Sequence, residues 1–295
     1  MPFNILVTGA HGQVGSQLVL RLKQEADIKV HAYGHKQLDL TDANAILHVI
    51  TDEIHAVVNC AAYTQVDLAQ SDPSAAWNIN AVAPELMAKA CHQKNILFLH
   101  YSTDYVYDND QTRPLTETDP CCPKSIYAIT KYEGEQKALY YNPKTIILRT
   151  SWVYSRQGQN FVNTIIRLAQ EKSELLVVDD QLGAPTYTPN LVDATLTILR
   201  RYLEYGSSNI FGIYNFANDG AISWYEFAKK IVAMRLIDCK VLPTSTQSFP
   251  RPAPRPRYSI FELTKIQAVF GIKPVPWEIA LQECIQPEKS YPTLD

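Results

Sequence analysis

The 295-residue sequence has no long hydrophobic run; its apolar stretches have the length of a strand and fall far short of the roughly 18 residues of a transmembrane helix. Its first residues lack the basic segment and cleavage site of a secretory leader. Its six cysteines include no Cys-x-x-Cys pair, so neither a zinc site nor a disulfide framework is indicated. The sequence also has no large excess of positive charge. Its net charge of -3 argues against general affinity for nucleic acid. We therefore expect a cytoplasmic protein that binds neither membranes nor nucleic acid.

Short apolar strands alternate with amphipathic helices in the first half of the chain. We expect strands at residues 3–8, 28–33, 56–59, 96–101 and 145–149, and helices at 14–25, 43–50, 73–92 and 126–140. This alternation predicts an α/β fold, a doubly wound parallel sheet of the Rossmann kind with helices on both faces. In such a sheet, ligands bind at the carboxyl ends of the strands.

The pattern loosens after residue 150, where turn residues and prolines become more frequent. The run Phe249–Arg257, with four prolines and three arginines, is the clearest change of composition. We expect residues 1–150 to form a dinucleotide-binding domain, with return elements near 188–216 packed on it. Residues 151–187 and 217–295 are expected to form a smaller, interleaved substrate-binding lobe.

A glycine-rich turn, Thr8–Gly15, separates the first expected strand from the first helix. A dinucleotide needs bare backbone there, because its pyrophosphate approaches the helix N-terminus, where unpaired N–H groups favour negative charge. The alternative is a turn that binds nothing, but the strand-turn-helix context favours nucleotide binding. The expected cofactor residues in this turn are Gly9, His11, Gly12, Gln13, Val14 and Gly15.

The second strand ends without the carboxylate that NAD-selective sites usually place there. His35 and Lys36 stand at that point and could bind a 2′-phosphate instead, which favours NADPH and leaves NADH possible. The alternative is that both are solvated loop residues. Asp39 and Leu40 follow, and we expect them beside the adenine.

Two further strand ends carry small or hydroxyl-bearing residues. The third strand runs into Ala61, Ala62 and Tyr63, where small side chains let a flat cofactor lie against the backbone. The fourth strand ends in His100-Tyr101-Ser102-Thr103-Asp104, which places hydroxyl groups at its carboxyl end.

Three Tyr-x-x-x-Lys pairs occur in the chain, and spacing alone does not choose among them. Pro143 interrupts Tyr140/Lys144, and Tyr225/Lys229 lies far from the glycine turn. Tyr127/Lys131 follows the Thr103 strand end and lies on an expected helix, where positions i and i+4 share a face. A glycine turn, a strand-end hydroxyl and this pair together form a specific combination.

These features resemble the extended short-chain dehydrogenases/reductases, most closely the dTDP-4-dehydrorhamnose reductase family. The first gap of two residues in the glycine turn is typical of the short-chain enzymes, whereas Arg149–Tyr154 and Asp179–Thr186 narrow the resemblance. The matching blocks span nearly the whole chain: Thr8–Gly15, Val57–Leu68, His100–Tyr107, Tyr127–Glu135, Leu148–Tyr154, Asn160–Val162, Val178–Thr186 and Pro250–Ser259.

The resemblance implies NAD(P)H-dependent reduction of the C4 ketone of a dTDP-4-keto-6-deoxy-L-sugar. Tyr127 is then the general acid, Thr103 holds the carbonyl oxygen, and Lys131 binds the ribose and lowers the phenol pKa. Bringing a tyrosine from its ordinary pKa to about 7 requires roughly 4 kcal/mol. Tyr101, Tyr127 and Lys131 join the implied cofactor contacts, and the implied substrate contacts are Thr64, Val66, Thr103, Asp104, Trp152, Asn160 and Arg255. Arg257 resembles a second substrate-side arginine.

The sequence departs from some family members, which bridge a dimer through magnesium. The corresponding positions here are Gln17 and Pro189, neither of which is a good magnesium ligand. We therefore expect no metal, and either a monomer or a homodimer.

Three other functions remain open. A nucleotide-sugar 4,6-dehydratase shares the cofactor core but needs a glutamate after the Thr-Asp pair, where this chain has Tyr105. A related deoxysugar reductase would give another product. A non-catalytic NADP-binding regulatory subunit, like the β subunit of methionine adenosyltransferase, would use the pocket only for structure.

Overall fold

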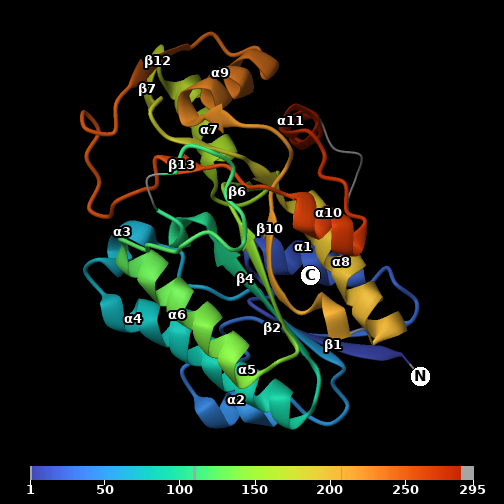
Figure 1. Cartoon of the computed structure of the whole chain (residues 1–295). Coiled ribbons are helices and arrows are strands. Elements are labelled where there is room, and N and C mark those ends of the chain that lie inside the picture. Colours follow the sequence, from blue (N-terminus) through green and yellow to red (C-terminus); the bar gives the residue numbers. More distant parts are fainter. Residues whose placement is uncertain (1, 109–110, 207, 287–295) are drawn as a thin grey trace.

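The computed structural model describes residues 2–108, 111–206 and 208–286. Within these residues, a six-stranded parallel sheet has the order β10-β5-β4-β3-β1-β2 (Figure 1). Its strands are β1 (Phe3–Thr8), β2 (Ile28–Tyr33), β3 (Ala56–Asn59), β4 (Leu97–Thr103), β5 (Thr145–Thr150) and β10 (Gly212–Phe216). The predicted doubly wound α/β fold is confirmed.

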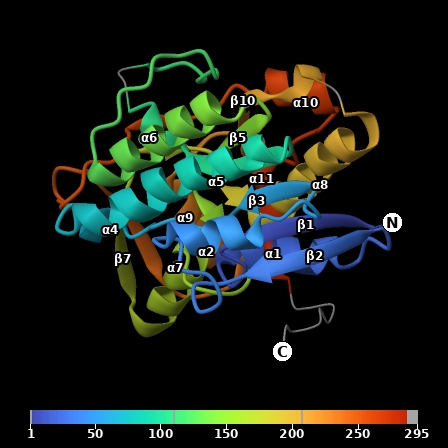
Figure 2. The same cartoon turned by 90° about the horizontal axis from the view of Figure 1, so that it is seen from below.

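Helices cover both faces of this sheet, as the view from below shows (Figure 2). One face carries α1 (Gln13–Leu22), α8 (Thr188–Tyr205) and α10 (Thr264–Phe270), and the other carries α2 (Ala43–Val49), α5 (Ala83–Gln93) and α6 (Ile126–Tyr141). Since the central strands are buried on both sides, every residue of β3, β4 and β5 is buried. Continuous apolar runs, rather than alternation, therefore marked these strands in the sequence.

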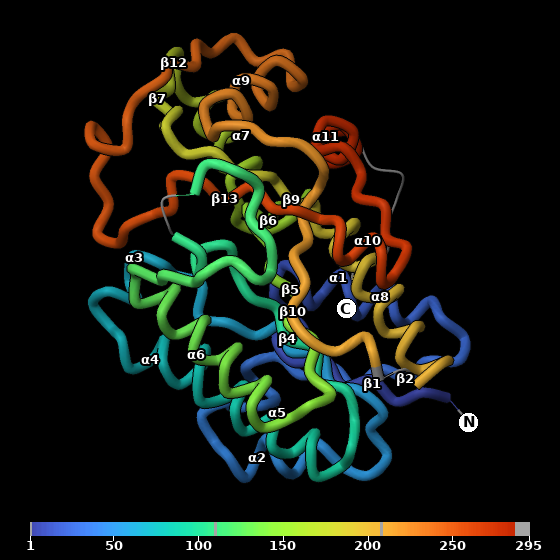
Figure 3. Tube along the Cα trace, viewed as in Figure 1, coloured from blue at the N-terminus to red at the C-terminus, as the bar shows by residue number. Residues whose placement is uncertain are grey.

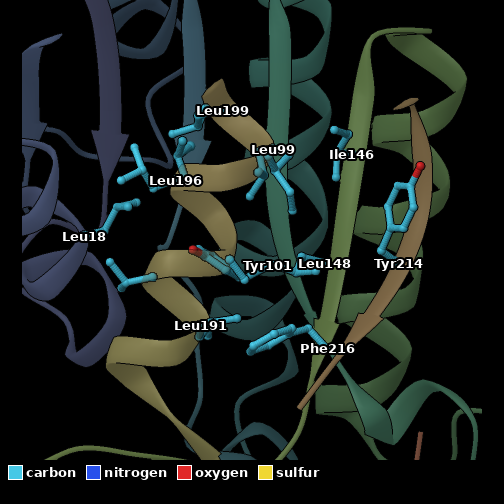
Figure 4. Packing of buried hydrophobic residues seen from close by; sticks show 14 of the residues in the cluster. Leu18, Leu99, Tyr101, Ile146, Leu148, Leu191, Leu196, Leu199, Tyr214 and Phe216 are labelled. Atoms are coloured by element: carbon cyan, nitrogen blue, oxygen red, sulfur yellow. The ribbon is translucent and has the colours of Figure 1, made fainter. Parts of the chain in front are cut away.

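The core under α8 shows how an amphipathic helix closes one face (Figure 4). Leu191, Leu196 and Leu199 lie on one side of α8 and pack against Leu99 and Leu18 of the layers beneath and beside it. Leu199 follows Leu196 by three residues and Leu191 by eight, and these helical spacings put the leucines on the buried face of the helix. The hydrophobic burial fixes α8 on this face of the sheet, beside α1.

A second lobe lies above the carboxyl ends of the strands, and the chain enters it more than once (Figure 3). It has its own buried cluster, to which Tyr154, Phe227 and Trp277 contribute. Its elements are β6 (Val153–Tyr154), α7 (Phe161–Glu171), β7 (Glu174–Val178), β8 (Leu182–Gly183), β9 (Thr186–Tyr187), β11 (Ile222–Ser223), α9 (Trp224–Met234), β12 (Lys240–Thr244), β13 (Tyr258–Ser259) and α11 (Trp277–Ile285).

One expected helix is interrupted. Residues 73–92 form α4 (Pro73–Trp77), a π-helical turn η1 (Asn78–Val82) and then α5. In that turn the Asn80 side-chain amide accepts a hydrogen bond from the Tyr63 nitrogen at 2.9 Å and donates one to the Tyr63 carbonyl oxygen at 3.1 Å. A Cβ at Gly134 would lie 2.0 Å from the Asn80 carbonyl oxygen, so α6 approaches the turn more closely than any other residue would allow. These contacts explain why the periodicity predicted one helix and the structure has three segments.

Two short elements follow strands of the main sheet: α3 (Val66–Ala69) comes after β3, and the 3₁₀ turn η2 (Asp104–Val106) comes after β4. Another 3₁₀ turn, η3 (Ser208–Ile210), precedes β10. Across the described ranges, no helix combines the length and apolar character needed to cross a membrane.

Candidate active site

A cleft of about 450 Å³ opens at the carboxyl ends of β1, β2 and β3. The glycine turn forms one side of it. Gly9 has a φ of +63°, and a Cβ there would lie 2.6 Å from the Ala61 nitrogen. A Cβ at Gly15 would lie 2.2 Å from the Gly9 carbonyl oxygen. Bare backbone is therefore required on both the cleft side and the helix side of the turn, which fits the approach of a dinucleotide pyrophosphate.

Most of the residues that we expected to bind the cofactor line this cleft. They are Gly9, His11, Gly12, His35, Asp39, Leu40, Ala61, Ala62 and Tyr63. The His11 ring lies against Gly34, where a Cβ would approach its Nδ1 to 2.2 Å. Asp39 accepts hydrogen bonds from the backbone and side chain of Thr41, which lower the pKa of its carboxyl. The carboxylate thus shapes the turn at the end of the cleft.

Other expected cofactor residues lie away from the cleft lining. Lys36 is exposed beside His35, and Val14 packs against the core. Gln13 donates from Nε2 to the Val153 carbonyl oxygen at 3.0 Å, which joins α1 to the second lobe.

The expectation for the Tyr101 side chain was wrong. Its ring lies in the core beneath α8, and its hydroxyl lies 2.6 Å from the Thr195 hydroxyl (Figure 4). Successive side chains of a strand point to opposite faces, so Tyr101 turns away from α6 while His100 turns toward it. Only the carbonyl oxygen of Tyr101 contacts a site residue, as the acceptor of a hydrogen bond from Lys131 Nζ at 2.6 Å.

Helix α6 carries both Tyr127 and Lys131. Ser125 caps this helix, because its Oγ accepts from the Ala128 nitrogen at 3.1 Å. The Tyr127 phenol lies beside the Thr103 hydroxyl, which lowers its pKa, and its ring packs edge-on against Tyr105 with centroids 5.6 Å apart. The helix and the end of β4 thus bring together the strand-end hydroxyl and the tyrosine of the motif.

Lys131 is not among the groups that shift the pKa of Tyr127 in the structure, although we expected it to lower that pKa. Burial raises the pKa of Tyr127 to about 12, and the hydrogen bond to Thr103 offsets only part of that rise. Lys131 directs its amine to the Tyr101 carbonyl oxygen and to His100, whose Nε2 lies 3.1 Å away. Burial also lowers the pKa of Lys131 to about 8. The half-buried phenol of Tyr127 is therefore held in its protonated, proton-donating form.

Asp104 is a second ionisable group at this strand end. It is buried, and its Oδ1 accepts from the Thr103 hydroxyl at 3.1 Å. Burial raises the pKa of its carboxyl to about 7, although hydrogen bonds from Ser259 and Thr103 oppose the rise. Its other oxygen has no hydrogen-bond partner among the described residues. Ser259 belongs to β13, so Asp104 lies where the second lobe meets the sheet.

Trp152 forms an aromatic wall between the lobes. Its backbone has a φ of +48°, which is rare for a residue with a bulky side chain. The indole stacks on Trp224 with centroids 3.5 Å apart, and a Cβ at Gly183 would approach its Cε2 to 2.6 Å. The ring is thus held on two sides, and this packing stabilises the left-handed backbone conformation of Trp152.

Arg255 and Asn160 already have partners within the protein. Arg255 forms a two-pronged ion pair with Asp67 of α3, at 2.7 and 2.9 Å, which joins the second lobe to the first. Asn160 caps α7 by accepting from the Asn163 nitrogen, and it donates to the Ser155 carbonyl oxygen at 2.9 Å. Val66 begins α3, and Thr64 lies just before it.

Sequence reasoning missed the buried polar residues behind the site. Arg149 had been singled out as part of a substrate-like block, but its side chain is 1% exposed and pairs with Glu135. His100 and Asn59 are also buried, and they connect the end of β3 to Lys131. A polar residue inside an apolar strand was the available signal, because buried polar groups require partners.

Gln17 is half-buried on α1, and Pro189 is the second residue of α8. In the part of the chain that the structure describes, no group of three or more His, Cys, Asp or Glu residues could hold a metal ion.

Known proteins resemble the chain along nearly its whole length. The family model of the RmlD substrate binding domain matches residues 3–290. The dTDP-4-dehydrorhamnose reductase of Aggregatibacter actinomycetemcomitans is 37% identical, with 94% of this chain and 97% of that protein covered. A probable dTDP-4,6-dihydroxy-2-methyloxan-3-one 4-ketoreductase of Streptomyces antibioticus is 39% identical, with 94% and 93% covered. The solved structure of dTDP-4-dehydrorhamnose reductase from Bacillus anthracis in complex with NADP has a TM-score of 0.89 and 36% identity, with 96% and 99% covered.

Proposed function

The chain belongs to the family of the RmlD substrate binding domain, and we propose that it is an oxidoreductase that reduces dTDP-4-dehydrorhamnose to dTDP-L-rhamnose with NADPH. The observation that carries this proposal is the position of the half-buried Tyr127 phenol of α6 beside the buried Thr103 hydroxyl at the end of β4, which lowers the phenol pKa. A proton donor beside a second hydroxyl suits a ketone oxygen that gains negative charge during reduction.

In this reduction, Tyr127 and Thr103 would have separate roles beside that of the cofactor. The nicotinamide cofactor supplies a hydride to C4 of the sugar. Tyr127 transfers its hydroxyl proton to the ketone oxygen, and the Thr103 hydroxyl donates a hydrogen bond that orients this oxygen. Tyr127 then recovers a proton from solvent. Its high pKa supports this direction of reaction, because the phenol is protonated at neutral pH.

The cleft fits a dinucleotide. Gly9 and Gly15 leave room for the pyrophosphate at the start of α1, and Ala61 and Ala62 offer a flat surface. Lys36 would provide positive charge and His35, at the cleft, a hydrogen-bonding ring for a 2′-phosphate, with NADH as the weaker cofactor. The complex of the Bacillus anthracis relative with NADP supports this choice.

The second lobe would bind the dTDP-sugar. We assign residues 1–150, with the return elements at 188–216, to the cofactor and residues 151–187 and 217–295 to the substrate. Trp152 would pack against the sugar, and Asp104, Thr64 and Val66 would border it. Asn160 and Arg255 would lie at the edge of the site, and Arg255 would exchange part of its pairing with Asp67 for a phosphate.

We further propose a cytoplasmic enzyme that acts as a monomer or homodimer. No magnesium is assigned, because Gln17 and Pro189 are poor ligands for it.

The Streptomyces antibioticus relative favours a second candidate, a reductase of a related dTDP-linked ketose with another product. Purified protein should be mixed with NADPH and the 4-keto-6-deoxy-L-sugar nucleotide, and loss of nicotinamide absorbance followed. NMR of the product then distinguishes dTDP-L-rhamnose from its C4 epimer. If the protein binds NADPH but does not oxidise it, the reductase proposal fails and a regulatory role is favoured.

A further inference from the structure

Trp152 combines two unusual geometries. Its backbone φ of +48° lies in the left-handed region, which bulky residues rarely adopt. Its indole is nearly parallel to that of Trp224, at 10°, and the ring centroids are only 3.5 Å apart. Stacked aromatic rings are usually offset, with centroids at least about 4.5 Å apart, so these two rings lie almost directly over one another. Two unfavourable geometries in one residue indicate that the surrounding structure imposes its position, as is common at functional sites.

Residues 183–186 hold Trp152 through both its backbone and its ring. The Ser151 hydroxyl donates to the Ala184 carbonyl oxygen at 2.7 Å, and the Thr186 nitrogen donates to the Trp152 carbonyl oxygen at 3.2 Å. A Cβ at Gly183 would lie 2.6 and 2.7 Å from Cε2 and Cζ2 of the Trp152 indole. Gly183 does not have a left-handed φ, so the glycine leaves space for the indole rather than permitting a special backbone conformation.

Trp224 covers one face of the Trp152 indole and is itself well supported. It is the first residue of α9, and Ser223 caps this helix by accepting from the Glu226 nitrogen at 3.1 Å. The Trp224 ring also packs against Phe161 of α7, with centroids 4.3 Å apart. A capped helix and a second aromatic side chain therefore fix the ring on which Trp152 stacks.

The stacked pair lies close to the end of β4. Gly183 of β8 pairs with Ser259 of β13. The Ser259 hydroxyl lies beside the Asp104 carboxyl, whose pKa it lowers, and Asp104 Oδ1 accepts from the Thr103 hydroxyl at 3.1 Å. The half-buried Trp152 indole is therefore one strand away from the residues that border the proposed ketone site.

We propose that Trp224 is a positioning residue that fixes the orientation of Trp152 before the sugar binds. This inference rests on the proposed reductase function. An indole that is already held in one orientation loses little further freedom when a sugar packs against it, so preorganisation strengthens binding. The indole offers an apolar surface, which suits the C–H groups and the methyl group of a 6-deoxy sugar. Loss of Trp224 therefore weakens sugar binding and leaves proton transfer from Tyr127 nearly unchanged.

The stack can be measured by NMR without any ligand. Protons that lie over the face of a neighbouring indole are shifted upfield by its ring current. In protein with labelled tryptophans, we expect upfield-shifted ring protons of Trp152, assigned by their loss in Trp152→Phe. Trp224→Leu should move these signals downfield. Trp152 signals that are not shifted upfield, or that do not respond to Trp224→Leu, would overturn the proposal.

Steady-state kinetics test the consequence for the substrate. Trp224→Leu should raise the KM for the sugar nucleotide about tenfold and change kcat less than about threefold, because it removes binding that substrate and transition state share. The KM for NADPH should not change. Trp224→Phe retains a flat ring and should restore most of the affinity. Tyr225→Leu, at the next position of α9, is the control for loss of an aromatic side chain from this helix and should leave both constants near their original values.

Two further results separate the possible explanations. A lower kcat with an unchanged KM in Trp224→Leu would contradict the proposal, since it would indicate a defect other than weaker sugar binding. Gly183→Ala displaces the indole while Trp224 remains, so it should raise the same KM even if Trp224→Leu does not fold. If the unmodified protein does not oxidise NADPH with the sugar nucleotide, the reductase proposal fails, whereas NMR still decides whether Trp224 fixes Trp152.

Discussion

Arg149 and Glu135 form a bidentate ion pair in which both side chains are buried. Arg149 Nε lies 2.9 Å from Glu135 Oε1, and Nη2 lies 2.5 Å from Oε2. The guanidinium also lies over the Tyr107 ring, 4.7 Å from its centroid. The pair joins β5 to α6, the helix that carries Tyr127 and Lys131. Its role is therefore to fix α6 on the sheet rather than to contact a substrate.

Glu135→Gln should destabilise the protein strongly. The substitution leaves the Arg149 charge buried without a counter-charge, so we expect the free energy of unfolding to fall by about 3–5 kcal/mol. Urea unfolding at neutral pH measures this change. Glu133→Gln, at a half-exposed position of the same helix, is the control and should change stability by less than about 0.5 kcal/mol. Similar losses in the two variants would show that the pair has no special role.

Tyr127→Phe should lower kcat at least about a hundredfold, the scale of general acid catalysis. The ring and its packing on Tyr105 remain, so NADPH affinity should change little. Steady-state kinetics and a fluorescence titration with NADPH measure the two quantities. Tyr132→Phe, on the same helix but packed against the core, is the matched control. Near-normal turnover of Tyr127→Phe would remove this residue from the mechanism.

Asp104→Asn should change how stability depends on pH. The folded-state pKa of Asp104 is raised from 3.8 to about 7, so the folded protein binds a proton that the unfolded chain releases. The contribution of this bound proton to the free energy of unfolding is therefore fully present below about pH 4. It is lost as pH rises toward 7, at up to about 1.4 kcal/mol per pH unit. Between pH 4 and pH 8, the free energy of unfolding should fall less steeply with rising pH in Asp104→Asn than in the unmodified protein. In Asp72→Asn, at the exposed N-cap of α4, the original slope should persist.

The cofactor preference can be tested at the end of β2. Replacing His35 and Lys36 together by alanine should raise the KM for NADPH about tenfold, which corresponds to about 1.4 kcal/mol, and leave the KM for NADH nearly unchanged. Lys29→Ala, an exposed position of β2, controls for the general loss of positive charge. An equal effect on both cofactors would mean that His35 and Lys36 do not bind the 2′-phosphate.

The sequence predicted the sheet well because its strands are short apolar runs bounded by turn residues. The bounds of β1, β2 and β3 agree with the structure to the residue. Tyr127 and Thr103 also come together as expected, since a strand end and the next helix are close in sequence and in space. What pattern reasoning missed depends on distant partners. Nothing near His100 in the sequence indicates that Asn59, 41 positions earlier, contacts its ring at 2.9 Å.

The misplacement of Tyr101 has a different cause. Strand alternation places Tyr101 and His100 on opposite faces of β4, so only one of them can face α6. The resemblance to a family suggested the tyrosine, whereas the buried histidine is the neighbour of Lys131. The alternation of side chains along β4 therefore indicates that His100 and Tyr101 cannot both face α6, and our prediction for Tyr101 did not take it into account.

Strand β10 has a consequence for how the protein could be divided. It follows most of the second lobe's strands in the chain, yet it is the edge strand beside β5 in the main sheet, and α9 to α11 come after it. A cut anywhere between residues 151 and 211 would separate β10 from the strand that it pairs with, and a cut after β10 would split the second lobe. Neither lobe can therefore be produced alone by a single truncation, and the cofactor-binding part would need residues 188–216 joined to residues 1–150 by a new connection.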